Sequence, residues 1–393
     1  MSADGGPITD DGSPVELYAR MPTFGEPELV HEAIPPGTEI LELGAGAGRM
    51  THRLLELGHP VVAVDSSAEM LAQVHGAETV HAPIEGLDLG RRFGCVLLAS
   101  QLVNVDDDRQ RADFLQTCAR HVASDGTVLV QRYDPAWAAD PKPAESVRDG
   151  ITFRTLEARR DGERLTATVE YEVDGRTWRH GPFTSRILDE AELEARLWVG
   201  GLRLDRWIDD ARTWLAATPL ADISALHVAI PSADPIVAAD RLRWDSAGVA
   251  VPAHVTILFP FLHPDGLDAD ADAALREVVA GVEPFQVRFA RIGRFPTVTW
   301  LEPEPSGPFA RLTDAVVARW PDHPPYEGEH AEVVHHLTVA YGAPPEVHAR
   351  LARELTPMLP IVDHVSEVTL SVRRSGRWSV EQSYRLGRIG SDA

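Results

Sequence analysis

A glycine-rich turn that joins an apolar strand to a helix is the feature that most constrains the fold of this chain. The run EILELGAGAGRM places Gly44, Gly46 and Gly48 after the strand, and the next apolar run, VVAVD, ends on Asp65. Glycines let the backbone turn tightly and let a ligand approach closely, and a carboxylate in that place can accept hydrogen bonds from two ribose hydroxyls. Since such turns also occur in dinucleotide-binding proteins and by chance, the surrounding pattern has to decide the interpretation.

Strand and helix patterns alternate five times around this turn, from Glu39 to Asp134. The alternation predicts an α/β domain with a parallel, doubly wound sheet. After Pro135 the pattern changes to period-2 alternation with Asp-Gly turns at 161–162 and 174–175. That pattern predicts antiparallel hairpins, which we expect as an insertion in the α/β domain.

Length and composition indicate a protein of two or three domains that lies free in the cytoplasm. The chain has 393 residues, which is too long for one ordinary domain. No apolar run approaches the roughly 20 residues needed to span a bilayer, and the polar N-terminus does not resemble a signal peptide. Only Cys95 and Cys118 are present, which favours a reducing compartment. The net charge of -23 disfavours broad binding to nucleic-acid backbones.

A second motif, His followed by an apolar residue, Thr and another apolar residue, occurs twice. The copies begin at His254 and His336, and each lies in an apolar run typical of a strand. Positions i and i+2 of a strand share one face, so each copy presents an imidazole and a hydroxyl together. Two such strands side by side would place His254, Thr256, His336 and Thr338 in one pocket.

That set of side chains suits acid–base chemistry on a phosphodiester. Imidazole has a pKa near ~6.5, so one neutral and one charged histidine can serve as base and acid at neutral pH. Threonine hydroxyls can bind the phosphoryl oxygens and stabilise negative charge. The chemistry requires no metal, and we expect none. A single His-x-Thr is usually an ordinary strand residue, whereas two matched copies are rare.

A short segment that contains Pro219 predicts the division of the chain into domains. We expect an N-terminal domain over residues 1–217, a linker over 218–225 and a C-terminal domain over 226–393. The paired motif lies entirely in the third of these ranges.

Three N-terminal runs, ELGAGAGRMT, VVAVDSSAEML and FGCVLLASQLVN, resemble motifs of class I S-adenosylmethionine-dependent methyltransferases over roughly residues 15–217. The resemblance implies a Rossmann-like fold and S-adenosyl-L-methionine as cofactor. The glycines would line its methionine moiety, Asp65 its ribose, and Ser66 with Met70 its adenine. One departure is Ala82, where many relatives carry an acid, so Glu85 or the backbone would hold the adenine amino group. The full cofactor set that the resemblance implies is Glu42, Gly44, Ala45, Gly46, Gly48, Asp65, Ser66, Met70, Ile84, Glu85, Ser100 and Gln101.

The methyl acceptor is expected beyond the carboxyl ends of the strands, where ligands of such sheets bind. Polar residues that fall there are Tyr18, Gln101, Asn104, Tyr133 and Asp134. Each is more often structural or solvated than catalytic at such a position. A small molecule, a peptide or a nucleotide fits as the acceptor.

The C-terminal runs PAHVTILFPF, VEPFQVRFARIGRFPTVTWLEP and HPPYEGEHAEVVHHLTVA resemble the 2H phosphoesterase superfamily, also called the 2′–5′ RNA ligase-like family. The resemblance implies an α+β domain of two pseudo-symmetric lobes. It makes His254 and His336 the acid–base pair, without saying which is the base, and gives the phosphate to Thr256 and Thr338. His335 stands where many relatives have proline, and strand alternation turns it away from the site.

Three aromatic residues, Phe259, Phe295 and Tyr326, are expected either as a wall for a base or ring, or as core. The sequence thus favours a bifunctional enzyme that combines methyl transfer with cleavage of a cyclic phosphodiester, with an RNA end as one substrate class. One alternative keeps methyl transfer and makes the C-terminal domain a non-catalytic binding module for a nucleotide or partner. Another is a scaffold that only binds S-adenosylmethionine.

Overall fold

The computed structural model describes residues 8–9, 12–245, 250–329, 332–374 and 376–387. The chain divides into two compact units, which are described separately. The first unit comprises Met1–Glu190 and Leu202–Pro219, and the second comprises Ala191–Gly201 and Leu220–Ala393.

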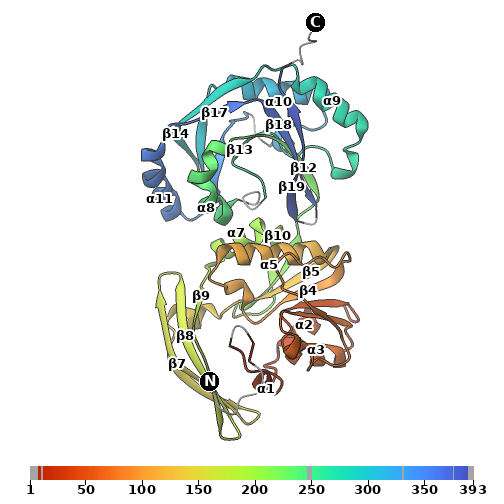
Figure 1. Ribbon diagram of the computed structural model, residues 1–393, viewed down its shortest axis with the longest axis vertical. Helices are drawn as coiled ribbons and strands as arrows, with labels where there is room; N and C mark the ends of the chain where they lie inside the picture. Colours follow the sequence, from red (N-terminus) through yellow and green to blue (C-terminus); the bar gives the residue numbers. More distant parts are fainter. Residues whose placement is uncertain (1–7, 10–11, 246–249, 330–331, 375, 388–393) are drawn as a thin grey trace. The chain divides into compact units, whose positions relative to one another are not determined.

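A seven-stranded sheet forms the centre of the first unit (Figure 1), in the order β10-β11-β5-β4-β1-β2-β3. The five strands from β3 to β5 are parallel, while β11 runs antiparallel to both β5 and β10. The predicted Rossmann-like α/β fold is therefore confirmed. The strands are β1 Ile40–Leu43, β2 Val61–Asp65, β3 Glu78–His81, β4 Phe93–Leu98, β5 Val122–Gln131, β10 Leu202–Trp207 and β11 Trp214–Pro219.

Helices cover this sheet and bury their apolar sides against it. Val30, Leu54 and Leu97 belong to one buried cluster and come from α2, α3 and β4 respectively. Four buried residues in succession make β1 a fully buried strand, as expected for a parallel sheet with both faces covered. The helices are α1 Val15–Tyr18, α2 Glu26–Ala33, α3 Arg49–Glu56, α4 Ala68–Leu71, α5 Asp108–His121 and α6 Pro135–Ala139, with a 3₁₀ turn η1 at Leu102–Asn104.

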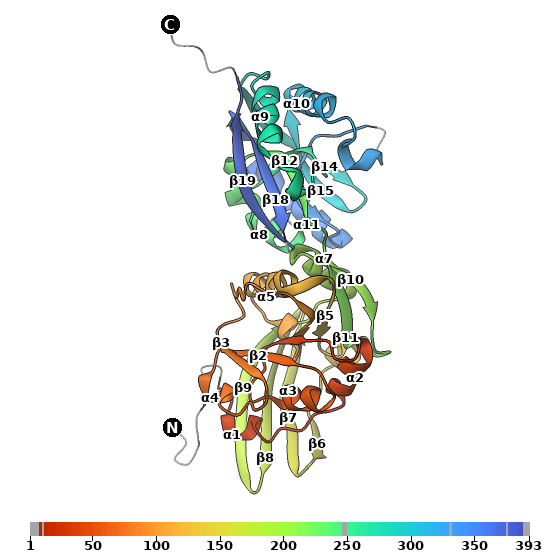
Figure 2. The same cartoon turned by 90° about the vertical axis from the view of Figure 1, so that its right-hand side faces the viewer.

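The predicted antiparallel insertion is a separate four-stranded sheet in the order β6-β7-β8-β9, seen as long yellow-green ribbons in Figures 1 and 2. Its strands are β6 Ala144–Arg148, β7 Ile151–Asp161, β8 Arg164–Val173 and β9 Arg176–Arg186. One face carries an aromatic row in which Phe153 pairs with Tyr171 and Tyr171 pairs with Trp178. At the next position along the strands, oppositely charged residues pair: Arg154 of β7 lies opposite Glu170 of β8. The two hairpin turns lie at the predicted Asp-Gly pairs.

The boundary between the units at Pro219 and Leu220 falls within the range expected for the linker, 218–225. Residues 214–219 form β11, and β12 begins at Ile223, so only residues 220–222 lie outside strands. β11 is mostly buried because it pairs with strands on both sides. Pro219 suggested a linker, yet a proline is tolerated at the end of a strand. The helix α7, Glu190–Val199, precedes β10 in the chain, but its residues from Ala191 onward belong to the second unit.

An eight-stranded antiparallel sheet in the order β17-β14-β15-β16-β13-β12-β18-β19 forms the second unit. Its two halves of four strands meet at β13 and β16 through the pair Val255 and Leu337. The two predicted lobes correspond to these two halves, which form one continuous sheet joined at a narrow central junction. The strands are β12 Ile223–Ala229, β13 His254–Leu258, β14 Phe285–Phe295, β15 Val298–Glu304, β16 Leu337–Tyr341, β17 Ile361–Val365, β18 Glu367–Arg374 and β19 Arg377–Arg385.

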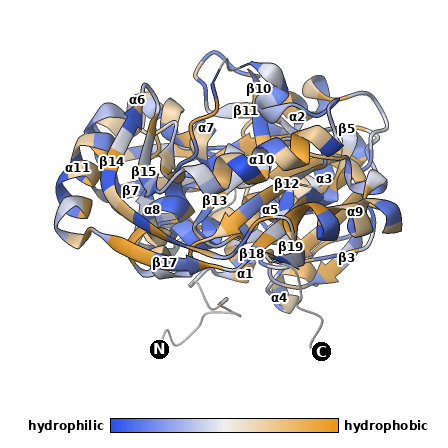
Figure 3. Cartoon of the chain, turned by 90° about the horizontal axis from the view of Figure 1, so that it is seen from above, coloured by the Kyte–Doolittle hydropathy of each residue, from blue (hydrophilic) through white to orange (hydrophobic). Residues whose placement is uncertain are grey.

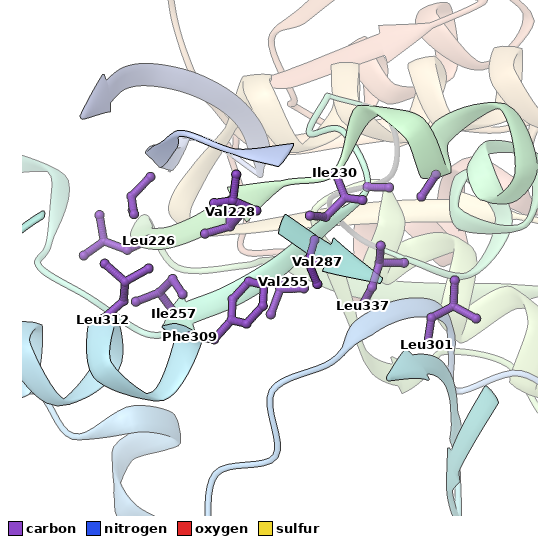
Figure 4. Packing of buried hydrophobic residues seen from close by; sticks show 14 of the residues in the cluster. Leu226, Val228, Ile230, Val255, Ile257, Val287, Leu301, Phe309, Leu312 and Leu337 are labelled. Carbon is purple, nitrogen blue, oxygen red and sulfur yellow. The ribbon is translucent and has the colours of Figure 1, made fainter. Parts of the chain in front are cut away.

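Alternate residues of these strands point into one large apolar core (Figure 4), where Val255, Ile257 and Leu337 pack with Phe309 and Leu312 of α10. Besides α7 from Ala191 onward, the α-helices of this unit are α8 Asp234–Trp244, α9 Ala269–Val279, α10 Gly307–Arg319 and α11 Pro345–Leu355. Helices such as α10 carry both hydrophobic and hydrophilic residues (Figure 3), as expected when one side packs on a sheet. Within the described residues, no helix has the length and apolarity needed to cross a membrane.

Candidate functional sites

The glycine turn, residues 44–48, lies where the strand order reverses between β1 and β4. Ligands of open α/β sheets bind at such a point, beyond the carboxyl ends of the strands. Gly44, Gly46 and Gly48 all have positive φ, at +75°, +56° and +86°. A Cβ atom on Gly44 would lie 2.8 Å from Leu102, whereas one on Gly46 would meet nothing within 4 Å. The turn therefore leaves open space in front of Gly46.

Asp65 closes this turn from the neighbouring strand. One carboxylate oxygen accepts a hydrogen bond from the Gly46 amide at 2.8 Å, and the other accepts one from the Ser67 amide at 2.9 Å. A carboxylate offers about four acceptor positions, so two remain for hydroxyl groups of a ligand. Asp65 thus shapes the turn and keeps the capacity to bind a diol.

Glu42 is a buried residue of β1, just before the turn. Its side chain is 3% exposed and accepts a 2.6 Å hydrogen bond from the Thr51 hydroxyl. Burial raises the pKa of Glu42 to about 7, against the lowering effect of Thr51 and Arg49. This hydrogen bond links the strand β1 to the helix α3 that follows the turn.

The other residues expected at the cofactor site differ in their burial, hydrogen bonds and backbone conformation. Met70 is buried with Val15 and Ala47, while Ser66 is exposed. Glu85 accepts a 2.7 Å hydrogen bond from Gln110. Further members are buried or partly buried near the turn, namely Ala45 and Ile84. Ser100 and Gln101, directly after β4, both have positive φ, a strained conformation that often marks functional sites.

Two residues expected near the methyl acceptor have structural partners instead. Asn104 is 2% exposed, donates to the Arg186 carbonyl at 2.7 Å and accepts from the Tyr133 amide at 3.1 Å. It therefore links β9 to the residue that follows Arg132 after β5, and these two hydrogen bonds use one N–H and one lone pair of its amide. Asp134 caps α6 by accepting from the Ala136 amide at 2.8 Å.

Three tyrosines lie close together in the first unit, and two of them were expected near the methyl acceptor. Burial raises the pKa of Tyr171, and the neighbouring phenols of Tyr18 and Tyr133 raise it further. The pKa of Tyr133 is likewise raised by burial, and its ring stacks on Trp137 at 5.8 Å. The aromatic row of the four-stranded sheet thus shares its surroundings with the N-terminal helix and the end of β5. The sequence indicated Tyr18 and Tyr133 but not Tyr171.

In the second unit, the register of β13 and β16 brings the two His-x-Thr motifs together. Val255 pairs antiparallel with Leu337, and both are 0% exposed in the core. Extending the register by one residue each way sets His254 opposite Thr338 and Thr256 opposite His336. These four residues are partly exposed and alternate with the buried pair, so they share the face away from the core. We call this set the His-Thr face.

The two histidines have similar backbone contacts but different neighbours. His254 Nδ1 lies 2.8 Å from the Pro252 carbonyl oxygen, and His336 Nδ1 lies 2.6 Å from that of Val334. Because a carbonyl only accepts, Nδ1 carries the hydrogen in both rings and Nε2 is left for the substrate. Burial and Arg241 lower the pKa of His254 to about 3, whereas burial lowers that of His336 without a contribution from an arginine.

Aromatic side chains flank the His-Thr face at both ends. Phe295 and Trp300 lie 5.2 Å and 5.6 Å from the His336 ring, measured between centroids. Phe259 lies 6.5 Å from Tyr326, whose hydroxyl hydrogen-bonds to Thr256. Phe259 and Tyr326 therefore lie together on the side of Thr256, whereas Phe295 lies beside His336.

Two residues at this site were not found from the sequence. Arg241 of α8 is 2% exposed and places a guanidinium nitrogen 3.4 Å from His254 Nδ1. His227 of β12 pairs with Thr256, and its ring centroid lies 4.6 Å from that of His254. His227 lies in the LHVAIP run. The one sequence feature that could have identified it is a histidine among the apolar residues of a strand.

His335 faces the other way, as strand alternation predicts. It is 8% exposed and its Nε2 lies 2.8 Å from the Thr313 hydroxyl of α10. Over the part of the chain that the structure describes, no three or more His, Cys, Asp and Glu side chains gather in a way that could hold a metal ion.

Comparison with known proteins finds one family-model match within each unit. Residues 40–126 match the family model described as a methyltransferase domain. Residues 228–377 match the model of the 2′-5′ RNA ligase superfamily. The chain thus carries a methyltransferase domain followed by a domain of the 2′-5′ RNA ligase superfamily, and both predicted resemblances are confirmed.

Individual relatives match one unit at a time. An uncharacterized methyltransferase of Mycobacterium bovis is 42% identical over 67 residues, which are 17% of this chain and 28% of that protein. The match thus spans little more than a quarter of the mycobacterial relative. A Bacillus pumilus protein named as a candidate phosphoesterase is 28% identical over 159 residues, covering 38% of this chain and 88% of that protein.

Solved structures are similar to this chain over about half of its length. The sugar N-methyltransferase KedS8 of Streptoalloteichus sp. is 19% identical, with a TM-score of 0.45, 56% of this chain and 99% of that chain covered. DesVI of Streptomyces venezuelae is 20% identical, with a TM-score of 0.42, 50% of this chain and 91% of that chain covered.

Proposed function

We propose that the chain is a bifunctional enzyme. The first unit transfers a methyl group from S-adenosyl-L-methionine to a small-molecule, peptide or nucleotide acceptor. The second cleaves a phosphodiester, with 2′,3′-cyclic phosphates and RNA ends as the substrate class. The observation that carries the second activity is the pairing of Val255 with Leu337, because this register sets two histidines and two threonines on one face.

Hydrolysis on the His-Thr face would need only the four side chains and water. One histidine takes a proton from water through Nε2 as the water oxygen forms a bond to phosphorus. The bond from phosphorus to the leaving ester oxygen breaks, and the other histidine gives that oxygen its Nε2 proton. Thr256 and Thr338 donate hydrogen bonds to the non-bridging oxygens, where negative charge grows. Proton exchange with solvent then restores both imidazoles.

The glycine turn has the features that S-adenosyl-L-methionine requires. The space in front of Gly46 admits the amino-acid part of the cofactor, and the free acceptor positions of Asp65 suit the ribose hydroxyls. Ser66, Met70 and Glu85 would border the adenine. When bound, the cofactor supplies an electrophilic methyl group on a sulfonium sulfur. The chain's own part is to orient the acceptor against it, with Tyr18 and Tyr133 on the acceptor side.

Turnover of 2′,3′-cyclic nucleotides by the full chain tests the phosphodiesterase. We expect a 2′- or 3′-monophosphate product from wild type, and about 10²–10⁴-fold slower hydrolysis from His254→Ala and from His336→Ala. A wild-type protein that binds these nucleotides but cleaves none of them would favour the alternative of a non-catalytic binding module.

Calorimetry tests the cofactor with the same preparations. The full chain and both histidine variants should bind S-adenosyl-L-methionine equally, because the glycine turn belongs to the other unit. Lack of binding by wild type would refute the methyltransferase proposal. Labelled cofactor in a cell extract of the source organism would then identify the acceptor by the product that carries the label.

A further inference from the structure

The tryptophan of α7, Trp198, contacts both halves of the eight-stranded sheet in the second unit. Its ring lies 6.4 Å from that of Tyr341, measured between centroids, and the two planes are 25° apart. The guanidinium carbon of Arg373 lies 6.0 Å from the same indole. Tyr341 ends β16 and Arg373 belongs to β18, so the indole bridges the two halves of the sheet.

Tyr341 lies on the same side of the sheet as the His-Thr face. The pairing of β16 with β15 skips Val339, and both Val339 and Ala340 belong to the core. Two core residues in succession reverse the alternation of the strand, so Tyr341 returns to the side of Thr338. Three strand residues span at most about 10 Å, so the phenol ring lies within the reach of a nucleotide whose phosphate is bound at Thr338.

Arg373 lies on this side too, in the other half of the sheet. Leu370 of β18 belongs to the core, so Thr369 and Arg373 point to the opposite side of the strand. Thr369 pairs with His227, and His227 pairs with Thr256 of the His-Thr face. Trp198 therefore contacts the open side of the sheet at both of its neighbours.

The Arg373 guanidinium holds the indole of Trp198 in place. It is 5% exposed, donates to the Ala221 carbonyl at 3.0 Å and lies 5.4 Å from the Trp378 ring. Burial lowers its pKa to about 10, so it remains a cation at neutral pH and attracts both indoles. Trp378 lies 6.4 Å from Phe259, which continues the aromatic line toward Thr256.

Trp198 and Tyr341 leave flat aromatic surface open to a ligand. Tyr341 is 53% exposed and Trp198 is partly exposed, whereas Trp300 and Trp378 are only 9% and 6% exposed. Bases of single-stranded nucleic acids bind proteins by stacking on such rings. An exposed pair of rings within reach of a phosphate site therefore fits a nucleobase.

We propose that Trp198 and Tyr341 form a stacking site for the base of a nucleotide whose phosphate is bound by the His-Thr face. The inference rests on the proposed phosphodiesterase function and adds the part of the site that recognises the base. Trp198 lies outside residues 228–377, which match the superfamily model, so α7 supplies a wall that the matched domain itself lacks. Because every base has a π-face, all four bases should bind, with a modest preference for the larger purines.

Two phosphate monoesters, adenosine 2′-monophosphate and glycerol 2-phosphate, test the site in NMR titrations of the full chain. Neither is a diester, so binding is measured without turnover. Wild type should bind the nucleotide at least about tenfold more tightly than the base-free probe. Trp198→Ala and Tyr341→Ala should each weaken nucleotide binding by about tenfold and leave glycerol 2-phosphate binding unchanged. Equal affinities of wild type for the two probes would overturn the proposal.

Matched variants separate stacking from folding. Trp198→Phe and Tyr341→Phe keep a ring and should keep most of the affinity for the nucleotide. Trp320→Ala removes a partly exposed tryptophan of the same unit that packs on Phe261 of the core, 5.1 Å between centroids. It should lose thermal stability and bind both probes as wild type does. A loss of nucleotide affinity in Trp320→Ala as large as in Trp198→Ala would overturn the proposal.

The exposed Tyr341 keeps the test decisive even where Trp198→Ala does not fold, because half of its side chain contacts no other residue. Unchanged nucleotide affinity in a folded Tyr341→Ala would overturn the stacking site. Turnover of 2′,3′-cyclic nucleotides is measured separately. A protein that prefers adenosine 2′-monophosphate through these two rings but cleaves no cyclic nucleotide would refute the phosphodiesterase and support the base site. Cleavage with an unchanged KM in Trp198→Ala and Tyr341→Ala would support the phosphodiesterase and overturn the base site.

Discussion

The two sites of this chain differ in which part of the polypeptide builds them. At the glycine turn the open space and the amide donor to Asp65 come from the backbone, and side chains such as Glu42 and Met70 support it while buried. On the His-Thr face the backbone only sets the register, and four partly exposed side chains supply the chemistry. Cofactor binding at the glycine turn should therefore weaken when a side-chain atom is added. Catalysis on the His-Thr face should slow when a polar side-chain atom is removed.

Among variants that test this comparison, removing one hydroxyl from the His-Thr face should have the largest effect. Thr256→Val and Thr338→Val keep the shape of the side chain but lose a donor to the phosphoryl group. Each should lower kcat for a cyclic phosphodiester by about 10²–10³-fold. Thr369→Val is the matched control, because Thr369 is a buried threonine of β18 that pairs with His227 and not with the motif strands. Equal losses in all three variants would show that packing, and not the donated hydrogen bond, is what matters.

Adding one methyl group to the glycine turn should weaken cofactor binding. Gly46→Ala places a Cβ in the open space and in a φ of +56°, which costs about 1–2 kcal/mol in a residue with a side chain. We expect at least about tenfold weaker binding of S-adenosyl-L-methionine by calorimetry.

Gly58→Ala provides the control for this strain. Gly58 also has positive φ, +91°, with nothing within 4 Å of an added Cβ, but it ends α3 away from the turn. Its variant should lose comparable thermal stability and keep its affinity. Full affinity in Gly46→Ala would contradict the view that the open space is the cofactor site.

The buried carboxyl just before the turn should make stability depend on pH. The folded-state pKa of Glu42 is about 7, above its unfolded value of 4.5, so the native state holds the extra proton between these values. Stability should therefore fall as pH rises from about 4.5 to about 7, and change little from this group above that range. Glu42→Gln keeps an acceptor for Thr51 and removes the titration. Thermal unfolding at pH 5 and pH 8 should show a smaller difference in Tm for the variant, and an unchanged difference would contradict the raised pKa.

The smallest effect is expected at the cap of α4. The Ser67 hydroxyl accepts from the Met70 amide at 3.2 Å, and Ser67→Ala should cost about 1 kcal/mol of stability. Cofactor affinity should fall only slightly, because the Ser67 amide still donates to Asp65. A loss of affinity as large as that of Gly46→Ala would mean that side chains matter as much as backbone at this site.

Local patterns in the sequence predicted much of both units. The alternation of strands and helices, the Asp-Gly hairpins and the two His-x-Thr strands depend on period and turn residues, which are visible in single segments. Strand β11 was missed because Ala-Ala-Thr-Pro has weak strand preference, and its burial comes from two partners distant in the sequence.

Contacts between distant elements were the part that the sequence could not predict. Arg241 lies on a helix and His254 on a later strand, so their approach depends on how α8 packs. The partnership of His227 with Thr256 depends on the register of β12 and β13. Asn104 was expected near the acceptor because of its position after β4, and its two backbone partners became visible only in three dimensions.

The junction at Val255 and Leu337 makes the second site sensitive to alignment. A slip of β13 by one residue would turn every side chain of that strand over, bringing Val255 onto the open face and His254 into the core. A slip by two would keep the faces but move the imidazoles apart by about two strand residues, roughly 7 Å. Val255 and Leu337, the apolar residues in the middle of the two motifs, therefore fix the alignment of the four polar side chains around them.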